Sequence, residues 1–305
     1  MVSHPSIVWM LFGAALLAVP WPATADGPYQ SELEAWRRNR EAGLKAEDGW
    51  LSVSGLYWLR EGQTRVGSDP SNDLVLPSHA PAEVGVITLK NGHVAFQAAK
   101  GAGVTLAGKP FSSGPIQSDQ LGEPDVLKVG DLRLIAIKRG ARLAIRLKDN
   151  QSPLRTSFAG LRFYPPRDDW RIQAKFVPYA SPVKLSFDTI VGETEVEESP
   201  GYVVFEYGGQ EYRLQAARLK DGGLWLVFRD LTSGRTTHGG ARQLSTAPPM
   251  GDKVELDFNK AVNLPCAYIP FATCPLAPPQ NRLKVAIEAG ELKYEPRAGG
   301  SAAAH

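Results

Sequence analysis

Three charged residues and a histidine supply the side chains in this sequence that are best suited to chemistry. Asp230, His238 and Arg242 are close together along the chain, and Asp257 ends a segment of alternating apolar and polar residues. Two carboxylates can act as a general acid and a general base, and a guanidinium can stabilise developing negative charge. One interpretation is therefore a hydrolase or lyase that uses Asp230 and Asp257 as its acid/base pair, with Arg242 beside them.

The same residues also fit a ligand pocket without catalysis. In a cupped or barrel-like sheet, the polar face of the strand that ends at Asp257 would line a lumen. A few converging polar groups in a mostly apolar cavity are what a small-ligand site needs. The predicted ligand-binding residues are Asp230, His238, Arg242, Asp257, Asn259, Asn263, Asn281 and Arg282.

A third interpretation gives these residues structural roles. Asp and Asn side chains in proline-rich loops cap turns and satisfy backbone N–H groups, and Arg242 would then simply pair with a carboxylate. His238 is either a general base oriented by a carboxylate or, as we favour, a turn residue that hydrogen-bonds a backbone carbonyl. The structural interpretation predicts that Asp257→Asn lowers thermal stability, whereas the ligand interpretation predicts an intact fold.

Cys266 and Cys274 are the only two cysteines, and both lie in the proline-rich segment 257–283. In an oxidising compartment, a disulfide is the expected state of such a pair. Closing a ring of this size would contribute about 2–3 kcal/mol. Redox catalysis is not expected, because redox pairs usually have Cys-x-x-Cys spacing. The sequence therefore predicts a structural Cys266–Cys274 disulfide.

The N-terminus predicts export. Residues 7–19 form an apolar run that is too short to cross a bilayer, and Ala23-Thr24-Ala25 matches the small-x-small pattern that precedes signal-peptidase cleavage. We predict a signal peptide at residues 1–25, cleavage after Ala25, and a periplasmic or secreted protein that is not inserted in the membrane. The alternative is a cytosolic chain with a buried apolar N-terminus.

Composition and missing motifs argue against several functions. Lys and Arg total 34 while Asp and Glu total 32, a balance that argues against nucleic-acid binding. The sequence has no dinucleotide, phosphate-loop, nucleophile-elbow or His-Glu-x-x-His motif. Two cysteines and scattered histidines make a poor set of zinc ligands. No cofactor or metal is therefore predicted, and the expected partner is a small molecule of unknown identity.

The sequence pattern after the first helix is that of β-strands. Period-two alternation appears at residues 172–176, 183–187 and 254–258, and glycine-rich turns separate further strand candidates. The predicted fold is therefore mainly β. Its predicted parts are an N-terminal helix over 26–49, a β-sandwich over 50–150, an antiparallel, barrel-like β domain with a long Pro-rich loop over 151–296, and a disordered tail over 297–305.

The first half resembles a forkhead-associated (FHA) domain over residues 55–149. Three turn segments carry the resemblance, VGSDPSNDLVLP (66–77), VTLAGKP (104–110) and LKVGDLRL (127–134), and they imply an eleven-strand-type β-sandwich. FHA domains hold phosphothreonine with an Arg, a Ser-x-x-His segment and an Asn. This sequence has Ser68 and Ala107 in two of those places and lacks the Ser-x-x-His segment, so phosphopeptide binding is not expected.

Several segments resemble a bacterial family catalogued as domain of unknown function 1684. They are GWLSVSGLYWL (49–59), FRDLTSG (228–234), DFNKAVNLPCAYIPFATCPLAPPQNRL (257–283) and EAGE (288–291). The resemblance covers residues 36–291 and implies no known activity. The family commonly has Tyr at the position of His238, which argues against a catalytic base there.

The sequence thus predicts an exported β-protein and leaves open whether it is an enzyme. The favoured function is a non-catalytic binding or envelope protein with a small polar pocket in its C-terminal half. The alternative is the hydrolase or lyase that uses Asp230, Asp257 and Arg242.

Overall fold

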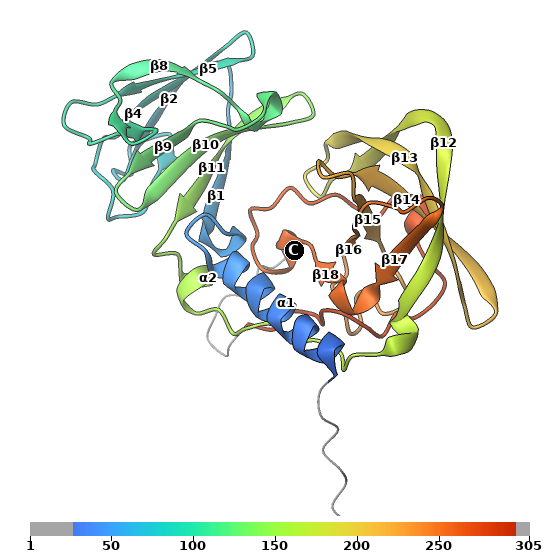
Figure 1. Cartoon of the computed structure of the whole chain (residues 1–305). Coiled ribbons are helices and arrows are strands. Elements are labelled where there is room, and N and C mark those ends of the chain that lie inside the picture. Colours follow the sequence, from blue (N-terminus) through green and yellow to red (C-terminus); the bar gives the residue numbers. More distant parts are fainter. Residues whose placement is uncertain (1–26, 297–305) are drawn as a thin grey trace, which may run out of the picture.

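The computed structural model describes residues 27–296. The predicted signal peptide and C-terminal tail lie outside the described residues. The described chain is mainly β, with a long helix at its start and three sheets (Figure 1). The predicted fold class is confirmed in these features. No described helix has the length and apolar content that a membrane crossing requires.

The long helix α1 (Pro28–Lys45) connects to the sandwich through the 3₁₀ turn η1 (Trp50–Ser52). Pro28 occupies the first turn, where its missing N–H would have had no helical partner. Leu33 and Leu44 are the buried residues of the helix. Because these are few for a helix of this length, polar contacts contribute much of its docking.

The first two sheets pack face to face as an N-terminal sandwich of eleven strands. The six-stranded sheet has the order β1-β11-β10-β9-β6-β7, and the five-stranded sheet has the order β3-β2-β4-β5-β8. Aliphatic side chains such as Val66, Leu132 and Leu134, together with Phe96, fill the space between them. The strands are β1 (Val53–Trp58), β2 (Gly62–Gly67), β3 (Leu74–Val75), β4 (Gly85–Lys90), β5 (His93–Ala98), β6 (Thr105–Leu106), β7 (Lys109–Pro110), β8 (Ser113–Ile116), β9 (Val126–Val129), β10 (Leu132–Arg139) and β11 (Arg142–Asp149), with η2 (Asp119–Leu121) between β8 and β9.

The third sheet has seven strands in the order β17-β12-β13-β14-β15-β16-β18. It is an open sheet, because β17 and β18 are its two edges and no described ladder joins them. The strands are β12 (Arg171–Asp188), β13 (Thr194–Tyr207), β14 (Gln210–Arg218), β15 (Leu224–Phe228), β16 (Arg242–Ser245), β17 (Lys253–Asp257) and β18 (Val262–Asn263). The short helical elements around it are α2 (Pro153–Thr156), η3 (Asp168–Trp170), η4 (Phe258–Lys260), η5 (Pro265–Ala267) and η6 (Pro279–Asn281).

Both faces of this seven-stranded sheet are covered. One face packs around aromatic side chains that include Trp170, Phe228 and Phe258. The other face packs against the Pro-rich segment through residues such as Leu264 and Ile269, and also against Leu44 of α1. The expected wet lumen is therefore wrong, because the sheet is open and packed apolar side chains cover both of its faces.

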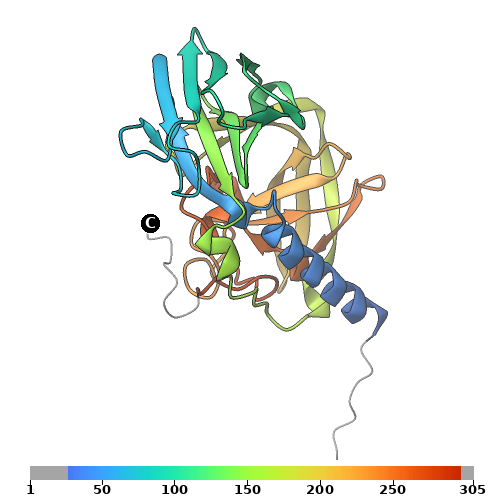
Figure 2. The same cartoon turned by 90° about the vertical axis from the view of Figure 1, so that its left-hand side faces the viewer.

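Charged contacts connect the sandwich to the C-terminal sheet. The two parts lie at the upper left and at the right in Figure 1, and the strands of the C-terminal sheet lie behind the sandwich in Figure 2. Arg139 of β10 donates to Thr273 Oγ1 (3.0 Å) and pairs with Glu195 of β13 (3.0 Å). Arg142 of β11 pairs with Glu193 at 3.7 Å. Ion pairs and a hydrogen bond therefore link the sandwich face that bears these arginines to the C-terminal part of the chain.

Candidate functional site

Asp230 and Arg242 form an ion pair whose side chains are completely shielded from solvent. Arg242 Nη2 also donates to Ile287 O (2.9 Å), and Nη1 donates to Ala289 O (2.6 Å). Asp230 Oδ1 accepts hydrogen bonds from the backbone N–H (2.6 Å) and the hydroxyl (2.5 Å) of Thr232. The pair thus holds its own turn against the C-terminal segment, and it presents no exposed atom to a substrate.

Asp257 lies in a separate network that fixes the N-terminal end of α1. Both of its carboxylate oxygens accept from the Tyr29 hydroxyl, at 2.9 and 3.0 Å, and Lys260 Nζ lies 3.4 Å away. Burial, followed by the hydrogen bond to Asp257, raises the pKa of the Tyr29 hydroxyl above its usual value. No described contact of Asp257 is shared with Asp230 or Arg242, so the proposed catalytic pair is not assembled by any of these contacts.

The side-chain amides of the predicted residues Asn259 and Asn281 hydrogen-bond to backbone N–H and C=O groups of distant segments. Asn259 exchanges two hydrogen bonds with the backbone of Arg167, both at 2.9 Å. Asn281 accepts from Gln215 N (2.7 Å) and donates to Gln215 O and Val227 O, both at 2.9 Å. Both amides are fully buried. Asn259 therefore joins η4 to the loop before η3, and Asn281 joins η6 to the backbones of β14 and β15. The remaining predicted residue, Arg282, donates from Nε to the backbone carbonyl of Ala277 at 3.4 Å.

Asn263 belongs to a buried cluster around Glu291, which we call the Glu291 cluster (Arg40, Asn263, Tyr268 and Glu291). Glu291 Oε1 accepts from Asn263 Nδ2 (2.9 Å) and from the Tyr268 hydroxyl. Glu291 Oε2 has no hydrogen bond and lies 3.9 Å from Arg40 Nε of α1. Burial raises the pKa of the Glu291 carboxyl, and burial, followed by the nearby carboxylate, raises the pKa of Tyr268.

His238 and the two cysteines lie beside this cluster. The His238 backbone N–H donates to Asn263 Oδ1 (3.4 Å), and its Nε2 lies 3.3 Å from Cys266 Sγ. The ring therefore contacts a sulfur instead of the backbone carbonyl that we expected. No described hydrogen bond joins the ring to a carboxylate, the arrangement that orients a general base.

Cys266 and Cys274 are both buried thiols in the structure, so the expected disulfide is not formed there. The backbone N–H of Cys266 donates to Cys274 Sγ at 3.1 Å. The hydrogen bond between the side chains, together with burial, raises the pKa of the Cys274 thiol. A disulfide in an oxidising compartment stays a prediction. Among residues 27–296, no group of three or more His, Cys, Asp and Glu side chains is arranged to hold a metal ion.

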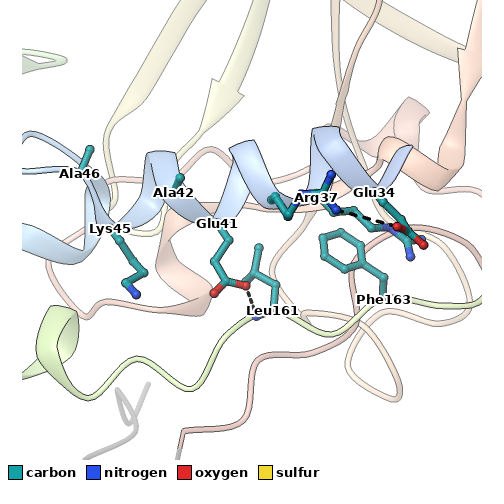
Figure 3. Close-up of a pocket in the computed structure, with 9 residues that line it drawn as sticks. Glu34, Arg37, Glu41, Ala42, Lys45, Ala46, Leu161 and Phe163 are labelled. Carbon is teal, nitrogen blue, oxygen red and sulfur yellow. Dashed lines mark hydrogen bonds and ion pairs between the residues drawn. The ribbon is translucent and has the colours of Figure 1, made fainter. Parts of the chain in front are cut away.

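A surface groove of about 700 Å³ lies between α1 and the extended segment 159–163 (Figure 3). We call it the α1 groove. Its charged lining residues are Glu34, Arg37, Arg38, Glu41 and Lys45, and its apolar ones are Ala42, Ala46, Leu161 and Phe163. The volume lies within the range of small-molecule sites, which is roughly 300–1,000 Å³.

The two walls of the α1 groove are fixed to each other. Glu41 Oε2 accepts the backbone N–H of Leu161 at 3.2 Å, and Figure 3 shows Glu41 and Lys45 projecting from the helix toward this wall. Arg37 Nη2 donates to Tyr164 O (3.0 Å), and its guanidinium lies 4.5 Å from the Phe163 ring centre. Desolvation lowers the pKa of Arg37. These contacts therefore fix the position of one groove wall relative to the other.

The structure does not gather the predicted site residues into one pocket. It places Asp230 and Arg242 in a buried pair, and Asp257 in the network that fixes α1. Asn259 and Asn281 bind the backbone of neighbouring segments, Asn263 belongs to the Glu291 cluster, and His238 lies beside that cluster. The residues predicted from the sequence did not include Arg40, Tyr268, Glu291 or any lining residue of the α1 groove. The signal available for Glu291 and Tyr268 was their presence in the family-like segments. The groove gave no such signal, because its walls are separated by more than a hundred residues.

Comparison with known proteins places the C-terminal region in a family. Residues 156–292 match the model described as "Protein of unknown function (DUF1684)". The solution NMR structure of an uncharacterized protein from Haloarcula marismortui has 31% sequence identity, covering 45% of this chain and 78% of that chain, with a TM-score of 0.39. The chain belongs to the DUF1684 family. No curated protein matches the chain.

The family match covers less of the chain than the resemblance over 36–291 implied. All predicted site residues and Glu291 fall inside the DUF1684 match, and so does one wall of the α1 groove. Helix α1, the other wall, lies outside it. A structure titled "Structural and functional analysis of phosphothreonine-dependent FHA domain interactions" has 15% identity, covers 30% of this chain and 92% of that chain, and has a TM-score of 0.22. The FHA-like interpretation therefore depends on the turn segments and the eleven-stranded sandwich.

Proposed function

We propose that this DUF1684 protein binds a ligand without transforming it, and that the ligand occupies the α1 groove. The observation that carries the proposal is a groove of about 700 Å³ with charged and apolar lining residues, between walls that already contact each other. Sites for small ligands are usually preformed and combine apolar surface with a few placed polar groups. This location replaces the small polar pocket that the sequence predicted around Asp230 and Asp257.

The state of the charged side chains supports binding over catalysis. The side chains of Asp230 and Arg242 have no exposed surface, and the only ion-pair partner of Asp257 among the described residues is Lys260. A general acid or base must reach the proton that it transfers, directly or through one water. The hydrolase or lyase alternative would require these two networks to open and approach each other. We further propose, from the N-terminal sequence alone, that binding takes place outside the cytoplasm.

The proposed site can be tested by filling the α1 groove with a large side chain. We choose Ala42→Trp, because Ala42 is an exposed lining residue of α1, and Asn39→Trp as the matched control, because Asn39 is exposed on the same helix outside the lining. Native mass spectrometry of the purified full chain should detect a bound small molecule in the wild type and in Asn39→Trp. The Ala42→Trp variant should lose that mass while its melting temperature stays close to that of the control.

The proposal fails if Ala42→Trp retains the bound molecule at the control level. It also fails if the wild type carries no small molecule and none of the probes named below binds to it. Catalysis would become the better function if a substrate were found whose turnover is abolished by Asp257→Asn in a protein that remains folded.

A further inference from the structure

The charges along the α1 groove are unequally satisfied. Glu34 pairs with Arg38 at 3.8 Å, and Glu41 accepts the Leu161 N–H at 3.2 Å. Neither Arg37 nor Lys45 lies within ion-pair distance of a carboxylate in the described part of the chain. The lining thus contains three cations and two carboxylates, and both carboxylates already have partners. The groove therefore favours a negatively charged ligand.

The position of Lys45 separates it from the other two cations. Arg37 is half-buried and donates to the backbone carbonyl of Tyr164 beside the Phe163 ring. Lys45 is exposed in the last turn of α1, eight residues later, which corresponds to about 12 Å along the helix axis. The ammonium group of Lys45 is therefore the cation that is most available to a ligand.

Apolar surface lies next to Lys45. Ala42 and Ala46 precede and follow it on the same face of the helix, and Leu161 faces them from the other wall. The two short alanine side chains leave the space that a longer side chain would fill. An apolar ligand body in contact with these three residues would remove their surface from water, which is favourable.

The end of the helix is also neutralised. The carboxyl end of a helix carries partial negative charge, which disfavours a nearby anion. Here Arg155 of the neighbouring α2 donates from Nε to Lys45 O (2.7 Å) and from Nη1 to Asn150 O (2.9 Å). The guanidinium adds a second positive charge close to Lys45 and covers one of the terminal carbonyls. An anionic group beside Lys45 is therefore compatible with the helix end.

We propose that the ligand of the α1 groove is an organic anion with an apolar body, an inference that depends on the function proposed above. Its anionic group pairs with Lys45, and its apolar body lies against Ala42, Ala46 and Leu161. Because the ion pair is near the surface, added salt weakens binding through screening.

Probes that share one tail and differ in head group test the ligand class. We would titrate the full chain with octanoate, with the neutral octyl glucoside and with octyltrimethylammonium, following binding by isothermal titration calorimetry. Octanoate should bind most tightly, and its affinity should fall between about 50 and about 500 mM salt, as expected for a screened ion pair.

The variant Lys45→Glu tests the cation that is proposed to hold the anionic group. It should lower the affinity for octanoate about tenfold, because it replaces an attractive surface pair with a repulsive one. Lys220→Glu, an exposed change distant from the groove in sequence, is the matched control and should leave the affinity unchanged.

The outcomes separate the two proposals. If octyl glucoside or the cationic probe binds as tightly as octanoate and Ala42→Trp abolishes that binding, the groove is a ligand site but the anion inference is wrong. The inference is equally wrong if Lys45→Glu leaves the octanoate affinity at the level of Lys220→Glu. If no probe binds to the wild type, the anion inference is overturned, and the proposed site fails with it when the wild type also carries no small molecule. If Ala42→Trp binds every probe normally, both the inference and the proposed site are overturned.

Discussion

The buried pair of Asp230 and Arg242 and the α1 groove are two charged regions that differ in how their side chains are satisfied. Arg242 has no exposed surface, and its guanidinium reaches Asp230 and two backbone carbonyls. Lys45, by contrast, is exposed next to open space and has no carboxylate partner among the described residues. A buried charged group whose hydrogen bonds and ion pair are all made within the protein contributes to folding. A charged group at a groove that has no carboxylate partner can instead pair with a ligand.

The largest expected effect comes from breaking the buried pair. Arg242→Met leaves Asp230 buried without its counter-ion, so we expect the free energy of unfolding to fall by about 3–5 kcal/mol. Urea denaturation followed by circular dichroism would measure it. Arg38→Met is the control, because Arg38 pairs with Glu34 on the surface, and it should change stability by less than about 1 kcal/mol. Equal losses of unfolding free energy in Arg242→Met and Arg38→Met would contradict the conclusion that the buried pair contributes more to folding than the charges of the groove.

A smaller effect is expected where Asp257 anchors α1. Asp257→Asn replaces one of the two oxygens that accept from Tyr29 with an amide NH₂ group and removes the charge, and Tyr29→Phe removes the donor. Each variant should therefore lower the free energy of unfolding by about 1–2 kcal/mol. The double variant should lose less than the sum of the two single losses, because the partners interact directly. Fully additive losses in the urea transitions would show that the contact does not couple the helix to β17.

The smallest effect concerns the pH dependence contributed by Glu291. Burial raises the pKa of this carboxyl in the folded state, so the folded chain keeps the proton to a higher pH than the unfolded chain. As pH rises from the unfolded pKa to the folded one, the folded state binds more protons, and stability contributed by the protonated carboxyl is lost. Below the unfolded pKa this contribution is fully present.

The prediction is tested by comparing how steeply the urea midpoint changes with pH in the wild type and in Glu291→Gln. Glu291→Gln cannot titrate, so its urea midpoint should fall less steeply than that of the wild type as pH rises through that window. Arg40, Tyr268 and the neutral Asn263 face the carboxyl, and Glu288→Gln serves as an exposed control in the same segment. Parallel pH curves for Glu291→Gln and the wild type would show that Glu291 does not titrate differently on folding.

The alternation of apolar and polar residues along the sequence predicted much of the fold. Asp257 shows what this alternation could not predict. The alternation around residues 172–176 and 254–258 correctly indicated strands, which became β12 and β17. The same alternation placed Asp257 on a wet face, yet Asp257 is only 7% exposed. Strand periodicity describes one sheet face and contains no information about a helix that covers it. Here Tyr29, more than two hundred residues earlier, covers that position.

The candidate site shows the same limit. The structural interpretation of the sequence had Arg242 pair with a carboxylate, and in the structure its partner is Asp230. The sequence could not show that their side chains are fully buried, nor that Arg242 would bind the backbone at Ile287 and Ala289. The α1 groove was missed entirely, because no local pattern relates Lys45 to Leu161.

The sequence by itself determined the mainly β class, the opening helix, the eleven-stranded sandwich and the family, since these depend on local periodicity, turns and segments that remain readable in the linear chain. Only the tertiary structure decided which charged residues are buried partners and which remain available in a groove. The reason is physical: burial and pairing depend on what packs over a side chain, and at Asp257, Arg242 and Lys45 that is decided by residues distant in the chain.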